Sequence, residues 1–233
     1  MPSYFITGTD TDVGKTIIAL GLIKKLQRQG LKVAAMKPIS AGCEATPEGL
    51  RNSDAVQLQQ QSDVALDYNT LNPYAFSPAI APHIAAADEG VRIDIETIYQ
   101  HYLAIAAQSD CVIVEGAGGW QVPLNDFQTI ADLGKRLQLP VILVVGMRLG
   151  CISHTLLTVE SINRAGLPLA GWVANQLEPD MSRLAENITT LQQRIDAPLL
   201  GQVPYLEQPD AAAVVEHLAL PLQRNALRPS WAL

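Results

Sequence analysis

The sequence has few cysteines, few aromatic residues and no long apolar run. Its cysteines, Cys43, Cys111 and Cys151, are odd in number and widely spaced. Neither a disulfide framework nor a zinc site built from a CxxC pair is therefore expected. The longest apolar run, Val141 to Val145, falls far short of the ~20 residues that a membrane helix needs. We therefore expect no membrane-spanning segment.

Positive charge is also scarce, with 16 Lys and Arg against 23 Asp and Glu and a net charge of −7. A negative surface repels nucleic-acid phosphates and anionic lipid, so we expect neither nucleic acid nor membrane as a partner. Charged residues such as Asp10, Lys15 and Lys24 interrupt the first 25 residues, where a signal peptide would be apolar. These features predict a cytoplasmic protein in which a local basic site could still bind a small anion.

The 233 residues are 48% hydrophobic, which is enough to form a sizeable core. Short apolar runs alternate with helical patterns near residues 15–29, 94–109, 128–138, 153–165 and 182–195. This alternation predicts one α/β domain over residues 1–233, a doubly wound, mainly parallel sheet with helices on both faces. The predicted strands are Ser3–Thr7, Lys32–Met36, Cys111–Val114, Val141–Val145, Leu169–Ala174 and Leu199–Val203.

Residues 38–93 interrupt this alternation. They are rich in proline and contain one predicted short helix, near Ser53–Gln61. A long insertion in a compact α/β domain is usually functional, so we expect this one to contribute to a site. The final stretch, Leu218–Leu233, is predicted to be a docked or frayed tail.

A phosphate-binding loop follows the first predicted strand. It runs from Gly8 to Gly14-Lys15-Thr16 and leads into an amphipathic helix, the order that a P-loop requires. In such a loop, backbone N–H groups at the helix N-terminus bind phosphate oxygens. Lys15 is then expected to reach the β- and γ-phosphates, and the Thr16 hydroxyl to bind Mg²⁺. Five residues, rather than the usual four, separate Gly8 from Gly14. The alternative is a glycine-rich turn with a solvated lysine, which the strand, loop and helix order disfavours.

Other polar residues are predicted at the same edge of the sheet. Glu115 directly follows an apolar run, as a Walker-B-type carboxylate does, and the glycines after it allow close backbone approach. Lys37 and Asn175 also lie at the ends of predicted strands, where open parallel sheets bind ligands. Taken alone, Lys37 is more typical of a solvated lysine. Asp54 is either a metal ligand or part of a helix cap, and its local sequence favours the cap.

The chain resembles dethiobiotin synthetases from the first strand to about Leu206. The segments that carry the resemblance are Gly8-Thr-Asp-Thr-Asp-Val-Gly-Lys-Thr16, Lys37-Pro38, Arg51-Asn-Ser-Asp54, Asn72-Pro73, Pro82-His83, Val114-Glu-Gly-Ala-Gly-Gly119 and Gly171-Trp-Val-Ala-Asn175. The resemblance implies an ATP- and Mg²⁺-dependent, homodimeric cyclo-ligase of biotin biosynthesis. Such an enzyme converts 7,8-diaminopelargonic acid and CO₂ into dethiobiotin, ADP and phosphate through a carbamate and a carbamic-phosphoric anhydride.

The resemblance also assigns residues to roles. It implies that Lys37 and Lys15 are catalytic and that Thr16, Asp54 and Glu115 hold Mg²⁺. The nucleotide contacts that it implies are Asp12, Val13, Gly14, Lys15, Thr16, Ile17, Asp54, Glu115, Gly116, Ala117, Gly118, Asn175, Gln176, Pro204, Tyr205 and Leu206. The substrate contacts that it implies are Thr11, Lys37, Ser40, Ala41, Gly150, Cys151 and Ser153.

The sequence departs from the family pattern around the carboxylate tail of the substrate. The family binds this tail at a helix N-terminus across the dimer interface, where backbone N–H groups of Gly150 and Cys151 can serve. Ser153 stands where the family has asparagine, and Asn187 where it has tyrosine. Ala41 offers no hydroxyl, so either the preceding serine compensates or the contact there is made by the main chain.

The remaining residues of chemical interest have plainer interpretations. His83 is predicted to cap a helix start, whereas His101, His154 and His217 are predicted to be surface or core residues. Cys111, Cys151, Trp120 and Trp172 are predicted to pack in the core. The main alternative function is a switch ATPase like ParA or MinD. Those proteins carry an early P-loop lysine where this chain has Thr9 and Asp10.

Overall fold

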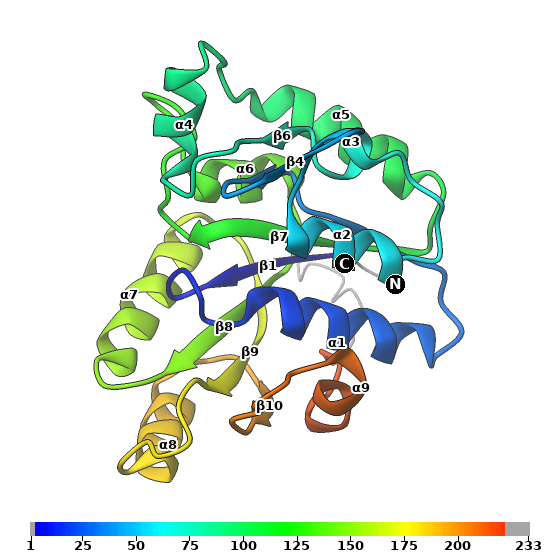
Figure 1. Cartoon of the computed structure of the whole chain (residues 1–233). Helices are drawn as coiled ribbons and strands as arrows, with labels where there is room; N and C mark the ends of the chain where they lie inside the picture. The colour runs from blue at the N-terminus through cyan, green and yellow to red at the C-terminus, as the bar shows by residue number, and fades with distance from the viewer. Residues whose placement is uncertain (1–2, 222–233) are drawn as a thin grey trace, which may run out of the picture.

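Six parallel strands form the central sheet of the computed structural model, which describes residues 3–221 (Figure 1). The strands lie in the order β10-β9-β8-β1-β7-β2, and every neighbouring pair is parallel. All six predicted strands are present, and the doubly wound sheet is confirmed. The strands are β1 (Tyr4–Gly8), β2 (Val33–Met36), β7 (Cys111–Gly119), β8 (Val141–Met147), β9 (Leu169–Gln176) and β10 (Leu199–Val203).

Helices cover both faces of this sheet, because successive strand residues point to opposite sides. On β1, Phe5 packs into the cluster that contains α5 and α6, whereas Tyr4 and Ile6 pack into the cluster that contains α1. A third cluster joins β8 and β9, including the fully buried Trp172, to α7 and α8. The five helices are α1 (Lys15–Gln27), α5 (Ile95–Ala106), α6 (Ile130–Leu137), α7 (Cys151–Arg164) and α8 (Leu184–Arg194).

The insertion lies on the β2 side of the sheet, opposite β10 (Figure 1). Its hydrophobic residues Leu71, Phe76 and Ala85 share a buried cluster with Met36 of β2, so it packs directly onto the sheet. It holds more structure than the one helix predicted. Its elements are β3 (Ile39–Ser40), β4 (Glu44–Thr46), β5 (Gly49–Arg51), α2 (Ser53–Gln61), α3 (Tyr68–Leu71), β6 (Tyr74–Ala75) and α4 (Pro82–Asp88).

The prediction that His83 caps a helix start is wrong. Helix α4 begins at Pro82, and Ala81 is its N-cap residue without a side-chain hydrogen bond. Proline is favourable at the first position of a helix, because its φ is already helical and it has no backbone N–H that would lack a partner there. Pro82 therefore starts this helix without a side-chain cap. His83 lies in the first turn instead.

The chain after β10 packs against α1. Helix α9 (Ala211–Val214) continues into a 3₁₀ turn over Val215–His217, and the side chains of Val214 and Leu218 lie against Gly21. The first part of the predicted tail, up to residue 221, is thus docked, and the rest lies outside the described residues. Within residues 3–221, no helix has the length and apolar character needed to cross a bilayer.

Candidate functional site

A cavity of about 890 Å³ opens at the carboxyl ends of β1, β2 and β7. The P-loop, the segment after β2, the N-terminus of α2 and the end of β7 line it. A second pocket of about 200 Å³ adjoins it, and Asp12, Gly14, Ile17 and Pro209 line both. The larger pocket contains Lys15, Lys37, Asp54 and Glu115, and the smaller one lies beside β9 and β10.

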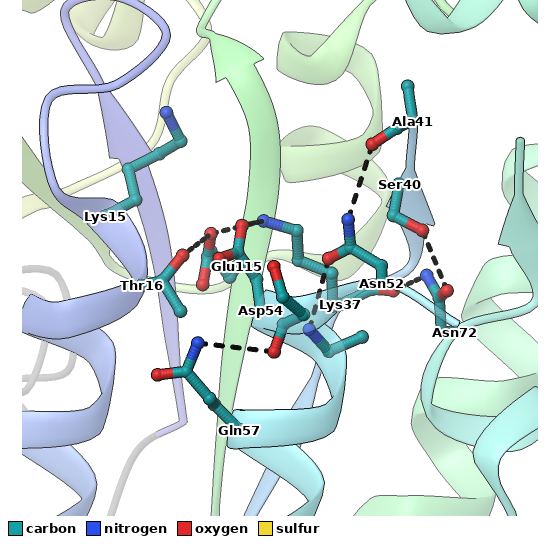
Figure 2. Close-up of polar contacts among 12 residues, drawn as sticks. Lys15, Thr16, Lys37, Ser40, Ala41, Asn52, Asp54, Gln57, Asn72 and Glu115 are labelled. Carbon is teal, nitrogen blue, oxygen red and sulfur yellow. Dashed lines mark hydrogen bonds and ion pairs between the residues drawn. The ribbon is translucent and has the colours of Figure 1, made fainter. Parts of the chain in front are cut away.

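The P-loop has the backbone conformation that phosphate binding requires. Gly14 is left-handed, with φ at 86°, and immediately precedes α1, and Gly14, Lys15 and Thr16 line the cavity, so the N-terminus of the helix lies at the cavity. The Nζ of Lys15 donates to the carbonyl of Asp10 at 2.9 Å, and in Figure 2 the side chain points away from the neighbouring carboxylates. Burial lowers the pKa of Lys15 to about 8, against the opposing effect of Glu115.

Four side chains from three elements and one loop form a connected polar chain (Figure 2). Thr16 Oγ1 donates to Glu115 Oε1 at 2.9 Å. The Nζ of Lys37 donates to the same oxygen at 2.5 Å and to Oδ2 of Asp54 at 3.0 Å. Burial alone would lower the pKa of Lys37, but Glu115 and Asp54 outweigh it and raise that pKa. Lys37 is therefore held as an ammonium ion, not as the solvated lysine that its local sequence favours.

Asp54 can join this chain because Asn52 caps α2 in its place. Asn52 Oδ1 accepts from the backbone N–H of Ala55 at 3.2 Å, as an N-cap residue does. Asp54 lies two residues further on, in the first turn, and its carboxylate faces Lys37. The cap interpretation of Asp54 is therefore wrong, although the segment does contain a cap.

The donor set suits a magnesium ion. Glu115 is completely buried, and its Oε2 has no hydrogen-bond partner among the described residues. A buried carboxylate oxygen without a partner is costly, and a cation bound there would satisfy it. No cluster of three or more Asp, Glu, His or Cys residues occurs within residues 3–221. Mg²⁺ suits such a sparse site, because it commonly takes one or two carboxylates and completes its shell with phosphate oxygens and water.

The second pocket brings together residues expected around the base of a nucleotide. Its lining includes Asn175, Gln176, Pro204, Tyr205 and Leu206. Asn175 Nδ2 donates to the carbonyl of Val13 at 2.9 Å, which ties β9 to the P-loop. The amide nitrogen of Gln176 donates to the carbonyls of Glu178 and Pro179, so it stabilises its own turn.

The residues predicted to contact the substrate fall into two groups. Thr11, Lys37, Ser40 and Ala41 line the large cavity. The hydroxyl of Ser40 is engaged within the protein, because it donates to Asn72 Oδ1 at 2.8 Å and lies 3.2 Å from the sulfur of Cys43.

The other group, Gly150, Cys151 and Ser153, lies at the start of α7 and lines neither hollow. Beside it, Leu149 is fully exposed, and the carbonyl oxygen of the Asn187 amide lies 4.0 Å from the sulfur of Cys151. Arg148, two residues before Gly150, forms an ion pair with Asp10 of the P-loop, but the group itself does not line the cavity that contains Lys37.

Several residues around the site were not predicted. Tyr68 and Asn72 form hydrogen bonds behind Lys37, and Arg148 forms an ion pair with Asp10 of the P-loop. Ile80 and Pro209 line the cavity. The Asn72-Pro73 segment was visible as a family motif, but no local pattern indicates what its side chain contacts.

Comparison with known proteins identifies the family. The family described as "AAA domain" matches residues 2–213. An ATP-dependent dethiobiotin synthetase of Pseudomonas aeruginosa strain UCBPP-PA14 is 52% identical over 221 residues, covering 94% of this chain and 97% of its own. Those of Cellvibrio japonicus and Escherichia coli K12 are 53% and 50% identical, each over 94% of this chain and over 96% and 98% of their own lengths.

Solved structures with the same fold are more distant. A ParA family ATPase from Chlorobium tepidum has a TM-score of 0.52 at 17% identity, with 88% of this chain and 85% of that chain covered. The septum site-determining protein MinD from Pyrococcus horikoshii has a TM-score of 0.52 at 18% identity, with 94% and 87% covered. These similarities concern the fold alone, whereas the sequence identities are high over nearly the whole length. The chain therefore belongs to the dethiobiotin synthetase family.

Proposed function

We propose that this protein closes the ureido ring of dethiobiotin from 7,8-diaminopelargonic acid and CO₂ at the expense of ATP, as a Mg²⁺-dependent homodimer of the cytoplasm. The observation that carries the proposal is the ammonium of Lys37, which forms ion pairs with Glu115 and Asp54 in the cavity that the P-loop lines. The relatives named above are ATP-dependent dethiobiotin synthetases, which supports the same reaction here.

The reaction needs no nucleophile from the protein. One substrate amine adds to CO₂ and loses a proton to form a carbamate, and a carbamate oxygen then takes the γ-phosphoryl group while ADP leaves. The second amine attacks the carbamate carbon and expels phosphate, which closes the ring. The protein must therefore position these groups and neutralise the negative charge that develops on the phosphoryl oxygens.

Two buried lysines serve that purpose. Lys15, in the P-loop, would contact the phosphates after leaving the carbonyl of Asp10. Lys37 approaches from β2 and would contact both the carbamate and the γ-phosphoryl group. Both side chains are less than a tenth exposed, so their charges act in a site where water screens them weakly.

Thr16, Asp54 and Glu115 would hold Mg²⁺, with the unpartnered Oε2 of Glu115 as the donor that supports this assignment most directly. The ion would supply a Lewis acid that neutralises charge on the phosphates. The base of ATP would lie in the 200 Å³ pocket. Asn175, which lines this pocket, donates a hydrogen bond to the carbonyl of Val13 in the P-loop.

A second copy of the chain would complete the substrate site. Leu149 is fully exposed and Leu157, two turns along α7, is 62% exposed, so an apolar stripe flanks the predicted tail site. Gly150 and Cys151 lie outside the cavity that contains Lys37. In the proposed dimer, α7 of a partner subunit would reach across to the same substrate.

The activity is tested by an assay of ADP release with and without 7,8-diaminopelargonic acid and bicarbonate. We expect ADP release to require both compounds and to stop in excess EDTA. ATP turnover that ignores the diamine would contradict the proposal and favour a ParA-like switch ATPase. Full turnover in EDTA would contradict only the magnesium assignment.

The affinity for ATP should depend on pH through Lys15. Below about pH 8 this lysine is protonated in the free enzyme, and above it the positive charge is lost. Calorimetry with Mg·ATP in the absence of the diamine should therefore show weaker binding above pH 8, approaching tenfold per pH unit. Lys37 adds nothing to this slope, because its pKa is raised.

The matched control is Lys15→Arg, whose guanidinium stays charged over the whole range. Its affinity should not change between pH 7 and 9.5, whatever its absolute value. A wild-type affinity that is equally constant would rule out Lys15 as the group that titrates.

The proposed dimer is tested by charging its apolar stripe. Leu149→Asp combined with Leu157→Asp should convert a dimer into the 25.1 kDa monomer in light scattering. The KM for the diamine should rise at least ~10-fold, while the Kd for ATP stays unchanged, because only the tail site is lost. The control is Leu103→Asp, on the exposed face of α5. A wild-type protein that is both monomeric and active would contradict the shared site.

A further inference from the structure

A buried polar cluster lies behind Lys37, on the side away from the P-loop. It consists of Ser40, Asn52, Tyr68 and Asn72, all less than a tenth exposed. Ser40 and Asn52 line the cavity, whereas Tyr68 and Asn72 line neither hollow and so cannot touch a substrate there. Burying four polar side chains is unfavourable unless each forms hydrogen bonds, so their arrangement needs a reason.

Asn72 holds the main chain of Lys37. Its Nδ2 donates to the carbonyl of Lys37 at 2.5 Å, and the N–H of Lys37 donates to the carbonyl of Leu71 at 3.1 Å. Both peptide groups that flank the Lys37 side chain are therefore bound to the end of α3. The direction in which this lysine leaves β2 depends on the insertion.

Tyr68 fixes which way the Asn72 amide faces. The Tyr68 oxygen accepts from the N–H of Asn52 at 2.8 Å, so its own proton is directed to Asn72 Oδ1, 3.1 Å away. The hydroxyl of Ser40 donates to the same Oδ1. With its oxygen taken by two hydroxyl donors, the amide must present Nδ2 to Lys37.

The cluster also reaches Asp54 and closes on itself. Asn52, which donates to Tyr68, is the N-cap of α2, and Asp54 lies in the first turn of that helix. Asp54 in turn accepts from the Nζ of Lys37. Together with the main chain from Asn52 to Asp54, these contacts form a ring that runs from the Lys37 carbonyl through Asn72, Tyr68 and Asn52 to Asp54 and back to Lys37 (Figure 2, which labels all of these except Tyr68).

We propose that Tyr68 and Asn72 are positioning residues that hold Lys37 and Asp54 in register for the reaction. The inference rests on the role of Lys37 in the proposed function, and it assigns part of the insertion to that role. The two carboxylates fix only the Nζ of Lys37, whereas Asn72 and Leu71 fix its main chain. The ring fixes its main chain as well as its tip.

The first test is Tyr68→Phe, which removes one hydroxyl and keeps the ring. We expect kcat to fall at least ~10-fold, because small displacements of a catalytic group carry losses of this order. The Kd for ATP without Mg²⁺, measured by calorimetry, should stay within ~twofold, because no P-loop contact is altered. Asn72→Asp, which keeps the acceptor but loses the donor to Lys37, should behave alike.

The matched control is Tyr74→Phe, in the same insertion. Its hydroxyl accepts from the N–H of Asp94 at 3.1 Å and touches no member of the ring. We expect it to keep wild-type kcat. A kcat for Tyr68→Phe equal to that of Tyr74→Phe would overturn the proposal.

A double-mutant cycle separates positioning from general destabilisation. If Tyr68 acts through Lys37, Tyr68→Phe should lower the residual turnover of Lys37→Ala by no more than ~threefold. A loss as large as in the wild-type background would show that the hydroxyl acts independently of Lys37, and would contradict the proposal.

A measurement without turnover keeps the proposal testable if the proposed reaction is wrong. Acetic anhydride labelling of the free enzyme, read by mass spectrometry, reports how well Lys37 is held. Lys37 should react several-fold faster in Tyr68→Phe than in wild type or Tyr74→Phe. Equal labelling in all three contradicts the ring, whereas a wild type inactive with the diamine contradicts only the proposed function.

Discussion

The buried ion pair between Lys37 and Glu115 is the interaction on which the site depends. Glu115 has no exposed surface, and a buried carboxylate without a partner would destabilise the fold. Lys37 and Thr16 both donate hydrogen bonds to its Oε1. The charged groups that a phosphoryl-transfer site needs, Lys37 and Glu115, are therefore buried, and Asp54 of the insertion contacts them through Lys37.

The strand order explains why these residues meet. β7 lies between β1 and β2, so Glu115 on β7 is flanked by the P-loop after β1 and by Lys37 after β2. Residues 78 positions apart in the sequence thus become hydrogen-bond partners. The insertion follows β2 directly, which brings Asp54 to the open side of the same pair.

Sequence reasoning recovered what local patterns encode. Apolar runs predicted the six strands. Strand ends predicted that Lys15, Lys37 and Glu115 lie together, and these three line one cavity, whereas Asn175 lines the adjoining pocket. It missed α3, α4 and the Tyr68–Asn72 contacts, and it assigned a cap to His83. These features depend on tertiary partners. A four-residue helix such as α3 has little stability of its own and forms because Leu71 is buried and Asp67 caps it.

The most direct test of the account is the turnover of Lys37→Ala, measured on protein shown to be folded by circular dichroism. If the Lys37 ammonium neutralises charge that develops during phosphoryl transfer, kcat should fall ~10²–10³-fold. Lys135→Ala, which removes only a surface ion pair, should retain wild-type kcat. Turnover of Lys37→Ala within ~threefold of wild type would contradict the central role of this lysine.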